Sequence, residues 1–297
     1  MPPSGPYRLV KLASGVHSVH SLAEGETFHP VIGPVAEAEA LYVRQLRLLE
    51  RLRSHRGEFV VWDVGLGAAA NALTVLRATR HLACSLRLVS FDHTLEPLEF
   101  GLAHASDLGY FGGYEARLLE LLRQRRVGFQ DAAQSVQWEL HLGDFPTFLA
   151  QSLQRCNAAT VQRLPAPHAI LFDAYSPAKN PAMWAQSVFA NLFKLLDPQR
   201  PCALPTYSRS TMLRVSLLLA GFFVGAGHAA GEKEETTIAA NTLDLIDEPL
   251  DHRWLGRARR STSAEPLWEA VYRQARLSPT TGEKLLQHPQ FSGLPVP

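Results

Sequence analysis

The chain has only three cysteines among its 297 residues, Cys84, Cys156 and Cys202, and no CxxC or Cys/His spacing. An odd number of widely separated cysteines argues against a disulfide framework and against a structural zinc site. Long apolar runs are also missing, because the longest, 217–227, is short and rich in glycine. The first residues lack the apolar core of a signal peptide. We therefore expect a cytoplasmic protein with no membrane segment and no bound metal.

An excess of charge of one sign is missing as well, since 29 Lys and Arg face 28 Asp and Glu and leave a net charge of +1. Proteins that bind nucleic acids by bulk electrostatics are strongly basic, so a nucleic-acid partner would need local basic patches. Two groups of arginines are candidates for such patches, although each is equally typical of a solvated protein surface. They are Arg123, Arg125 and Arg126, and Arg253, Arg257, Arg259 and Arg260.

Short runs rich in β-branched and aromatic residues alternate with helical patterns through the middle of the chain. The runs are 59–63, 86–92, 136–142, 168–173, 202–207, 222–224 and 236–241. This alternation is typical of a doubly wound α/β fold, and it predicts a Rossmann-like sheet of seven strands in which the last two form an antiparallel pair.

Three segments organise the chain around this sheet. Residues 1–54 predict a β arm at 7–21 and one helix at 36–53, with Pro34 in its first turn. Residues 55–245 form the predicted core, with an insertion at 109–131 that we expect to be a mobile, basic helical flap. The proline-bearing residues 246–297 predict an appendage packed on the sheet rather than a second domain.

A glycine loop follows the first strand of the predicted core, in the segment Asp63-Val-Gly65-Leu-Gly67. Glycines allow a ligand to approach the backbone closely, beside the N-terminus of the next helix. The loop is not GxGxxG, because Ala70 stands at the third glycine position, so a dinucleotide is disfavoured. A nucleoside without phosphates fits better, and S-adenosylmethionine is such a ligand, with its amino-acid end on the loop amides and Asp63.

Acidic residues also end the next two strands. Asp92 can accept both ribose hydroxyls, and its alternative role is that of a helix N-cap or turn residue. Asp144, after Gly143, can accept the adenine amino group, with Phe145 near the ring. Because ligands of open α/β sheets bind at the carboxyl edge, we expect the glycine loop and these carboxylates to form one cofactor site.

The fourth predicted strand ends in the loop Asp173-Ala-Tyr175-Ser-Pro-Ala-Lys-Asn180-Pro181. A carboxylate at this edge can orient an amine and accept its proton as a general base, which we predict for Asp173. Tyr175 can stack on a base. Asn180 and Pro181 are typical of the N-cap and first turn of a helix. The alternative is that the whole loop is a structural turn.

Several segments together resemble the methyltransferase part of the MnmC family, the bifunctional tRNA 5-methylaminomethyl-2-thiouridine biosynthesis proteins. The resemblance extends from about Glu26 to Arg260. The segments that carry it are Glu26-Thr-Phe-His29, Gly33 with Glu37, Asp63 to Leu73, Asp173-Ala-Tyr-Ser-Pro-Ala-Lys-Asn-Pro-Ala-Met-Trp184, Thr206-Tyr-Ser208 and Gly231 to Ala239.

The resemblance implies a class I methyltransferase fold and S-adenosyl-L-methionine as the cofactor. It also implies methylation of the aminomethyl nitrogen on the wobble uridine of certain tRNAs, with Asp173 matching the family's active-site aspartate. By the same resemblance Asn71 joins the cofactor residues, and Glu37 and Lys233 join Tyr175 as substrate-binding residues.

The sequence also departs from the family pattern. The fused members of the family have a flavin oxidase domain after this part, and the 297 residues are too few to include one, so we expect the stand-alone form called MnmD, without FAD and with a separate oxidase as partner. The family's Lys-Arg-Glu reads Lys233-Glu234-Glu235, and the segment around Glu37 lacks an arginine that is common in the family.

Two other classes of function stay open at this point. The same sheet also serves small-molecule N- or O-methyltransferases and aminopropyltransferases, since fold alone does not determine function. A non-catalytic RNA-binding or cofactor-sensing module is the second alternative, and in such a module Asp173 would be only structural.

Overall fold

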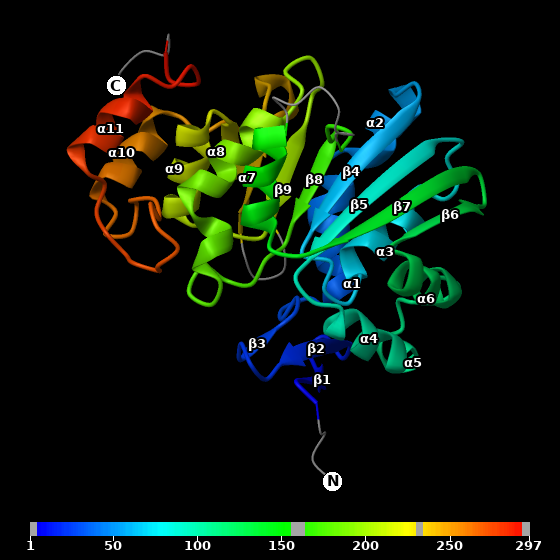
Figure 1. The fold of residues 1–297 in the computed structure, drawn as a ribbon. Helices are drawn as coiled ribbons and strands as arrows, with labels where there is room; N and C mark the ends of the chain where they lie inside the picture. Colours follow the sequence, from blue (N-terminus) through cyan, green and yellow to red (C-terminus); the bar gives the residue numbers. More distant parts are fainter. Residues whose placement is uncertain (1–4, 156–163, 230–233, 293–297) are drawn as a thin grey trace. The chain divides into compact units, whose positions relative to one another are not determined.

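The computed structural model describes residues 5–155, 164–229 and 234–292 (Figure 1). The chain divides into two compact units, which we describe separately. The first unit comprises residues 1–144, 169–173 and 228–234, and the second comprises 145–168, 174–227 and 235–297.

The first unit begins with the predicted β arm, an antiparallel sheet of three short strands. These are β1 (Tyr7–Lys11), β2 (His17–Ser21) and β3 (Glu26–Thr27), in the order β1-β2-β3. Just beyond β3, the Phe28 amide donates to the Val19 carbonyl at 2.8 Å, and the Ser18 hydroxyl donates to the Phe28 carbonyl. The arm therefore fixes the backbone that leads into His29.

The helix expected at 36–53 is instead three shorter elements. They are α1 (Pro34–Ala38), the π-helical η1 (Glu39–Arg44) and α2 (Leu48–Ser54). Proline stands at the first position of α1, as predicted. Residues 40–43 are all buried, and a π-helical turn changes the direction in which successive side chains point. A left-handed residue, Arg47 with φ +48°, then separates η1 from α2.

The main sheet of the first unit has the strand order β8-β4-β5-β7-β6. Strands β8, β4, β5 and β7 are parallel neighbours, and β6 pairs antiparallel with β7. Their bounds are β4 (Glu58–Val64), β5 (Ser85–Asp92), β6 (Arg126–Asp131), β7 (Gln134–Leu142) and β8 (Ala169–Phe172). All four residues of β8 are buried, as is typical of a strand in a parallel sheet.

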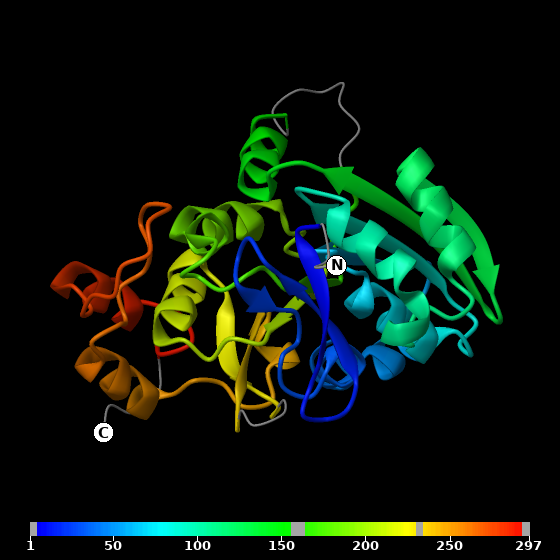
Figure 2. The ribbon, with the colours of Figure 1, turned by 90° about the horizontal axis from the view of Figure 1, so that it is seen from below.

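The helices of this unit include one in the predicted insertion. They are α3 (Ala70–Thr79), α4 (Glu96–Ala103), α5 (Ala105–Leu108) and α6 (Glu115–Gln124). The insertion at 109–131 is not entirely helical, because α6 is followed by β6. Phe111, Tyr114, Leu118 and Leu121 are buried, so this helix is packed, and it lies against the β6 and β7 pair in both ribbon views (Figures 1 and 2).

The second unit contains three antiparallel strands in the order β10-β11-β9. These are β9 (Ala203–Thr206), β10 (Phe223–Gly227) and β11 (Thr236–Ala240). Its helices are α7 (Phe145–Arg155), the 3-10 helix η2 (Pro181–Trp184), α8 (Gln186–Leu195), α9 (Thr211–Ala220), the 3-10 helix η3 (Leu243–Leu245), α10 (His252–Arg260) and α11 (Pro279–Leu286).

All seven predicted strands of the core are present, and among the described residues β6 and the short β3 are strands that the sequence did not predict. The prediction of an α/β fold built on a mostly parallel sheet is thus confirmed. The segment boundaries at residues 54 and 245 stay predictions. None of the helices in the described part of the chain is both long and apolar enough to cross a membrane.

Candidate active site

Three of the predicted acidic residues lie at the carboxyl edge of the sheet in the first unit. Asp63 is near the end of β4, Asp92 ends β5 and Asp173 directly follows β8. The Asp173 amide donates to the Val64 carbonyl at 2.9 Å, and the Gly65 amide donates to the Phe91 carbonyl at 3.0 Å. The ends of the three strands are therefore tied together, as predicted from the order of the elements.

The glycine loop has a conformation that depends on glycine. Gly65 and Gly67 have φ values of +93° and +52°, in the left-handed region that other residues rarely adopt. A Cβ atom at Gly67 would also lie only 3.2 Å from the Phe28 ring. The next helix, α3, has Ala69 at its N-cap and therefore no side-chain hydrogen bond to its first amides. This helix N-terminus suits an anionic ligand group such as a carboxylate.

Asp92 is hydrogen-bonded within the protein. Its Oδ2 accepts from the Gly67 amide at 2.8 Å, and its Oδ1 accepts from the His93 amide at 2.7 Å. The side-chain hydrogen bond to Asp92 is also the main reason that the pKa of His93 is raised. Asp92 thus orders the glycine loop, and this role is close to the turn role that we named as the alternative for Asp92. The contact of Asp92 with a ribose stays a prediction.

The predicted adenine-contacting residues fall on both sides of the division between the units. The Gly143 amide donates to the Asp92 carbonyl at 2.8 Å, which holds the end of β7 beside that of β5, and Asp144 is exposed. Phe145 starts α7 in the second unit, where its ring stacks on Phe148 with 6.4 Å between the centroids. The roles of Gly143, Asp144 and Phe145 stay predictions.

Asp63 is the most deeply buried of these carboxylates. The Ser90 hydroxyl donates to its Oδ2 at 2.8 Å, and the Trp138 indole in turn donates to the Ser90 hydroxyl at 2.9 Å. Burial raises the pKa of Asp63 to about 7; the Ser90 hydrogen bond opposes this rise, and the charges of Asp173 and Asp92 add to it. Its Oδ1 has no hydrogen-bond partner among the described residues.

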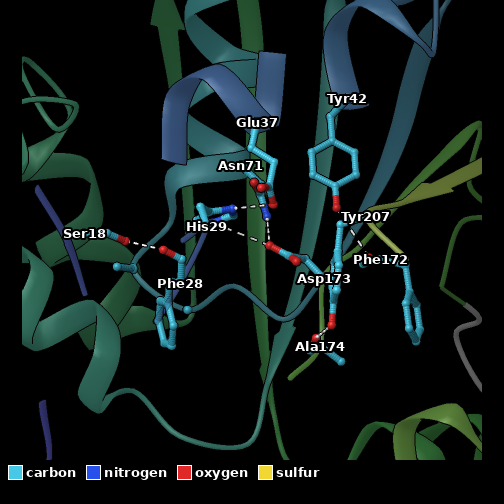
Figure 3. Close-up of polar contacts among 12 residues, drawn as sticks. Ser18, Phe28, His29, Glu37, Tyr42, Asn71, Phe172, Asp173, Ala174 and Tyr207 are labelled. Carbon is cyan, nitrogen blue, oxygen red and sulfur yellow. Dashed lines mark hydrogen bonds and ion pairs between the residues drawn. The ribbon is translucent and has the colours of Figure 1, made fainter. Parts of the chain in front are cut away.

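Asp173 belongs to a chain of polar contacts that begins at the β arm (Figure 3). Its Oδ2 accepts a hydrogen bond from Asn71 Nδ2 at 2.7 Å and lies 3.6 Å from His29 Nε2. On the other side of the imidazole, His29 Nδ1 donates to Glu37 Oε1 at 3.2 Å. Glu37 therefore holds His29, and Asn71 holds Asp173. Both residues have a positioning role within this unit.

His29 is a residue of this site that the sequence prediction missed. Burial alone would lower its pKa, but the charge of Asp173 and the hydrogen bond and charge of Glu37 raise the pKa to about 9. At neutral pH it is therefore an imidazolium between two carboxylates. Its backbone is left-handed, with φ +49°. The available signal was its place in the segment Glu26–His29, which carried part of the family resemblance.

Comparisons with known proteins agree with this geometry. Residues 115–242 match a family model described as S-adenosyl-L-methionine-dependent methyltransferase. MnmC of Ralstonia nicotianae is 28% identical over 256 residues, which cover 82% of this chain and 34% of that protein. MnmC of Aeromonas hydrophila is 27% identical over 223 residues, which cover 71% of this chain and 32% of that protein. This chain is an S-adenosyl-L-methionine-dependent methyltransferase and is similar to MnmC.

Solved structures share the fold of the methyltransferase. The crystal structure of MNMC2 from Aquifex aeolicus matches with a TM-score of 0.67 and 21% identity, over 97% of this chain and 84% of that chain. A spermidine synthase in complex with a transition-state analogue matches with a TM-score of 0.51 and 10% identity, over 97% and 82%. The expected family, enzyme class and cofactor are confirmed. The methyltransferase spans about a third of the length of its MnmC relatives.

The buried oxygens of the methyltransferase fit this cofactor. Asp63 Oδ1 and Asn71 Oδ1 are buried acceptors without a hydrogen-bond donor among the described residues. Unsatisfied buried acceptors are costly unless a ligand supplies a donor. S-adenosyl-L-methionine carries an ammonium group with three N–H donors, and its sulfonium adds a second positive charge. A buried carboxylate beside a left-handed glycine loop suits the ammonium end of such a molecule.

The backbone on either side of Asp173 is also held by tyrosine hydroxyls. Within the first unit, Tyr42 donates to the Phe172 carbonyl at 3.3 Å. Within the second unit, Tyr207 donates to the Ala174 carbonyl at 3.1 Å. The Trp184 indole donates to the Tyr175 carbonyl at 2.7 Å. The segment around the predicted general base is therefore fixed by hydrogen bonds.

The remaining predictions for the methyltransferase have mixed outcomes. Asn180 is the N-cap before Pro181 as predicted, but the helix is a 3-10 turn and the Asn180 side chain makes no capping bond. Tyr175 is half-buried in the second unit, and its stacking role stays a prediction. Lys233 lies outside the described residues. Among the described residues no group of three or more His, Cys, Asp or Glu is arranged to hold a metal ion.

The raised pKa of Asp63 predicts how stability depends on pH. The folded protein keeps a proton on Asp63 up to about pH 7, whereas the unfolded chain releases it near its ordinary value of 3.8. The contribution of this group to the free energy of unfolding is therefore present at low pH and lost as the pH rises through 7. We expect Asp63→Asn to remove a decline of about 2 to 3 kcal/mol between about pH 5 and pH 8, measured by urea unfolding.

Asp107→Asn is the matched control, because Asp107 is an exposed aspartate. The control should keep the wild-type dependence on pH. Parallel curves for wild type and Asp63→Asn would mean that Asp63 is ionised in the folded protein, contrary to the expectation from its burial.

Proposed function

We propose that this methyltransferase acts on tRNA and transfers a methyl group from S-adenosyl-L-methionine to the nitrogen of an aminomethyl group on a modified wobble uridine. One structural observation carries the proposal. It is the Asp173 carboxylate, which Asn71 and His29 hold at the strand edge that also bears Asp63 and the glycine loop. The names of the MnmC relatives, which concern tRNA 5-methylaminomethyl-2-thiouridine biosynthesis, support the choice of substrate.

N-methylation of an alkylammonium requires a proton acceptor, and a carboxylate such as Asp173 can be one. An alkylammonium has no free electron pair, so the nitrogen must lose a proton before or during its attack on a methyl group. A positioned carboxylate can hold the ammonium by its charge and accept the proton. The imidazolium of His29 and the amide of Asn71 both favour the charged form of Asp173. Asp173 is therefore an acceptor at neutral pH.

The charge of this edge also suits the two reactants. The carboxylates of Glu37, Asp92 and Asp173 gather here, with the imidazolium of His29 between two of them, and Asp63 adds a negative charge when a cationic ligand displaces its proton. A locally negative site attracts a positively charged amine and a positively charged cofactor. The site therefore favours a cationic amine over a neutral hydroxyl as the methyl acceptor.

Each group has a defined part in the proposed reaction. The cofactor supplies a methyl group that is activated by its bond to a sulfonium sulfur. Asp63 and the glycine loop would hold its amino-acid end, Asp92 its ribose, and Gly143, Asp144 and Phe145 its adenine. Asp173 orients the amine and takes its proton, so that the rate comes chiefly from positioning the two reactants. Tyr175 and Lys233 as RNA contacts, and a separate oxidase partner, stay predictions.

Replacement of the carboxylate tests the role of Asp173. Asp173→Asn keeps the size of the side chain but removes its charge and its ability to accept a proton. We expect kcat for methyl transfer from labelled cofactor to bulk tRNA to fall by about 100-fold or more, because general bases contribute 10²–10⁴. Calorimetry should show that the variant still binds the cofactor. Asp107→Asn is the control for the loss of one aspartate charge.

The methylated nucleoside identifies the substrate. Mass spectrometry of nucleosides from tRNA should detect methylaminomethyl uridine only when the wild-type protein and aminomethyl-bearing tRNA are both present. Methyl transfer to small amines or hydroxyls but not to tRNA would favour a small-molecule methyltransferase. Full activity of Asp173→Asn on tRNA would contradict the role of Asp173 while leaving the choice of tRNA intact.

The ion pair of His29 with Asp173 predicts a shift in the pH–rate profile. His29→Gln removes the positive charge that favours the carboxylate form of Asp173. We expect kcat to fall about tenfold, and the acidic limb of the profile to move to higher pH because Asp173 holds its proton more tightly. His81→Gln, at an exposed histidine, is the control. A drop in kcat with an unchanged pH–rate profile would mean that His29 contributes only to packing.

The arginines of α10 predict how tRNA binding depends on salt. Arg253, Arg257, Arg259 and Arg260 are exposed, and none of them forms an ion pair among the described residues. Two double variants, R253Q/R257Q and R259Q/R260Q, should each raise the KM for tRNA about 3- to 10-fold. A plot of the logarithm of tRNA affinity against the logarithm of salt concentration should also become less steep, by a slope of about one for every phosphate that the variant no longer binds. The affinity for the cofactor should not change.

The control for these variants is R53Q/R56Q, which removes two exposed arginines from the first unit. The same pairwise design applies to Arg123 and Arg126, which are exposed, whereas Arg125 is half-buried and its guanidinium donates to the Leu122 carbonyl. Wild-type KM at every salt concentration in the α10 variants would exclude this helix from the RNA-binding surface.

A further inference from the structure

The loop between α10 and α11 presents large apolar side chains to solvent. We call residues 264–278 the aromatic loop; it is drawn in orange in the ribbon views (Figures 1 and 2). All of the residues 268–276 are exposed. They include Trp268, which is 50% exposed, Val271 and Tyr272. Three large apolar side chains exposed within five residues of one short loop form a candidate surface for contact with a partner.

The aromatic loop is fixed at its base. The amides of Ala264 and Glu265 both donate to the Ala275 carbonyl, at 2.9 Å and 3.0 Å, and this closes the loop. The Gln186 amide donates to the Leu267 carbonyl at 2.8 Å, which ties the loop to the start of α8. The exposed side chains are thus carried by a backbone that is hydrogen-bonded on both sides.

Glu265 organises the interior of this base. Its carboxylate accepts hydrogen bonds from the Ser278 amide at 2.8 Å, the Thr281 hydroxyl at 2.8 Å and the Trp268 indole at 2.9 Å. Burial opposes its ionisation, but these hydrogen bonds lower the pKa of Glu265. Glu265 is therefore charged and already hydrogen-bonded, and it holds one edge of the Trp268 ring.

The ring of Trp268 is held on a second side by a cation. Lys284, on α11, places its ammonium over the ring at 5.9 Å from the centroid. A cation over a tryptophan ring is attracted by the negative face of the ring. The indole is therefore oriented before any partner binds, which reduces the entropy that binding would cost.

The segment that carries these aromatic side chains is rich in positive charge. Residues 252–286 contain seven Lys and Arg against three Asp and Glu, although the whole chain has a net charge of only +1. One of the three acidic residues is Glu265, whose carboxylate lies in the base of the loop. The exposed part of the loop itself contains two basic residues, Arg273 and Arg276, and one acidic residue, Glu269. The loop therefore suits a polyanion that has flat, apolar faces.

We propose that the aromatic loop binds unpaired bases of an RNA strand, with Trp268 and Tyr272 stacking on bases and Arg273 and Arg276 contacting phosphates. Single-stranded nucleic acids are bound by this combination of aromatic faces and cations. A protein partner would more often meet a surface with fewer charges at its centre. The inference rests on the proposed function in one respect, namely that the RNA is a tRNA.

The distribution of tryptophans provides a direct test. Trp268 is exposed, whereas Trp62, Trp138, Trp184 and Trp254 are all buried. Quenching of tryptophan fluorescence by a bound base should therefore come mainly from Trp268. We expect an unstructured oligouridine to quench the fluorescence of the full chain, a duplex RNA of equal length to quench it much less, and W268L to lose the quenching.

Binding measurements by anisotropy then test the contribution to affinity. W268A/Y272A should weaken binding of labelled oligouridine about 5- to 100-fold, since stacking on one side chain contributes a factor of roughly 5 to 150. L243A, which removes an exposed apolar side chain from η3 in the same unit, should have no effect. Because the replaced side chains are exposed, thermal melts should show that both variants fold.

The outcomes separate this inference from the proposed function. Wild-type RNA affinity in W268A/Y272A, or an absence of quenching in the wild type, would overturn the stacking role even if tRNA is methylated, and would leave a protein partner as the occupant. Quenching and weaker binding as expected, in a protein that methylates no tRNA, would support the stacking role and overturn the proposed substrate.

Discussion

The site depends on one buried ion cluster, in which the imidazolium of His29 lies between the carboxylates of Glu37 and Asp173. The removal of one member of such a cluster is costly, because it leaves the other charges buried without compensation. The members come from separate elements of the first unit: His29 follows β3, Glu37 is on α1, and Asp173 follows β8. The cluster therefore holds the β arm, the first helix and the edge of the main sheet in one arrangement.

The β arm also acts on the glycine loop. Phe28 is fixed to β2 through its amide and its carbonyl, and its ring lies where a Cβ atom of Gly67 would be only 3.2 Å away. Tyr7 packs on the same ring, with 6.5 Å between the centroids. Because Phe28 precedes His29, one short segment both limits the space over the glycine loop and places the cation beside Asp173. A change in the arm would therefore affect the glycine loop and Asp173 together.

The sequence predicted the parts of this site that depend on local pattern. Buried strands that end in Asp63, Asp92 and Asp173 are visible as apolar runs, and their common edge follows from the parallel order. His29 could not be found in this way, because its role depends on a contact with Asp173, which is far away in sequence. The edge strand β6 was missed because Val127 and Phe129 alternate with polar residues directly after a strongly helical pattern. The interruption of the helix after η1 depends on burial around residues 40–43, which periodicity alone does not show.

Burial by itself lowers the pKa of His29 and raises the pKa of Asp63. The neighbours of each group then determine the final pKa. Burial disfavours charge on both Asp63 and His29. His29 stays charged because it contacts two carboxylates, so its pKa rises to about 9. Among the described residues, Asp63 has the Ser90 hydroxyl and no cation to stabilise its charge, so its pKa rises to about 7. Asp173 already has the His29 cation beside it and is suited to accept a proton. Asp63 has no such cation and is suited to a ligand that supplies a positive charge. Under the proposed function the two carboxyl groups have different tasks: Asp63 would hold the ammonium group of the cofactor, and Asp173 would hold the amine that receives the methyl group.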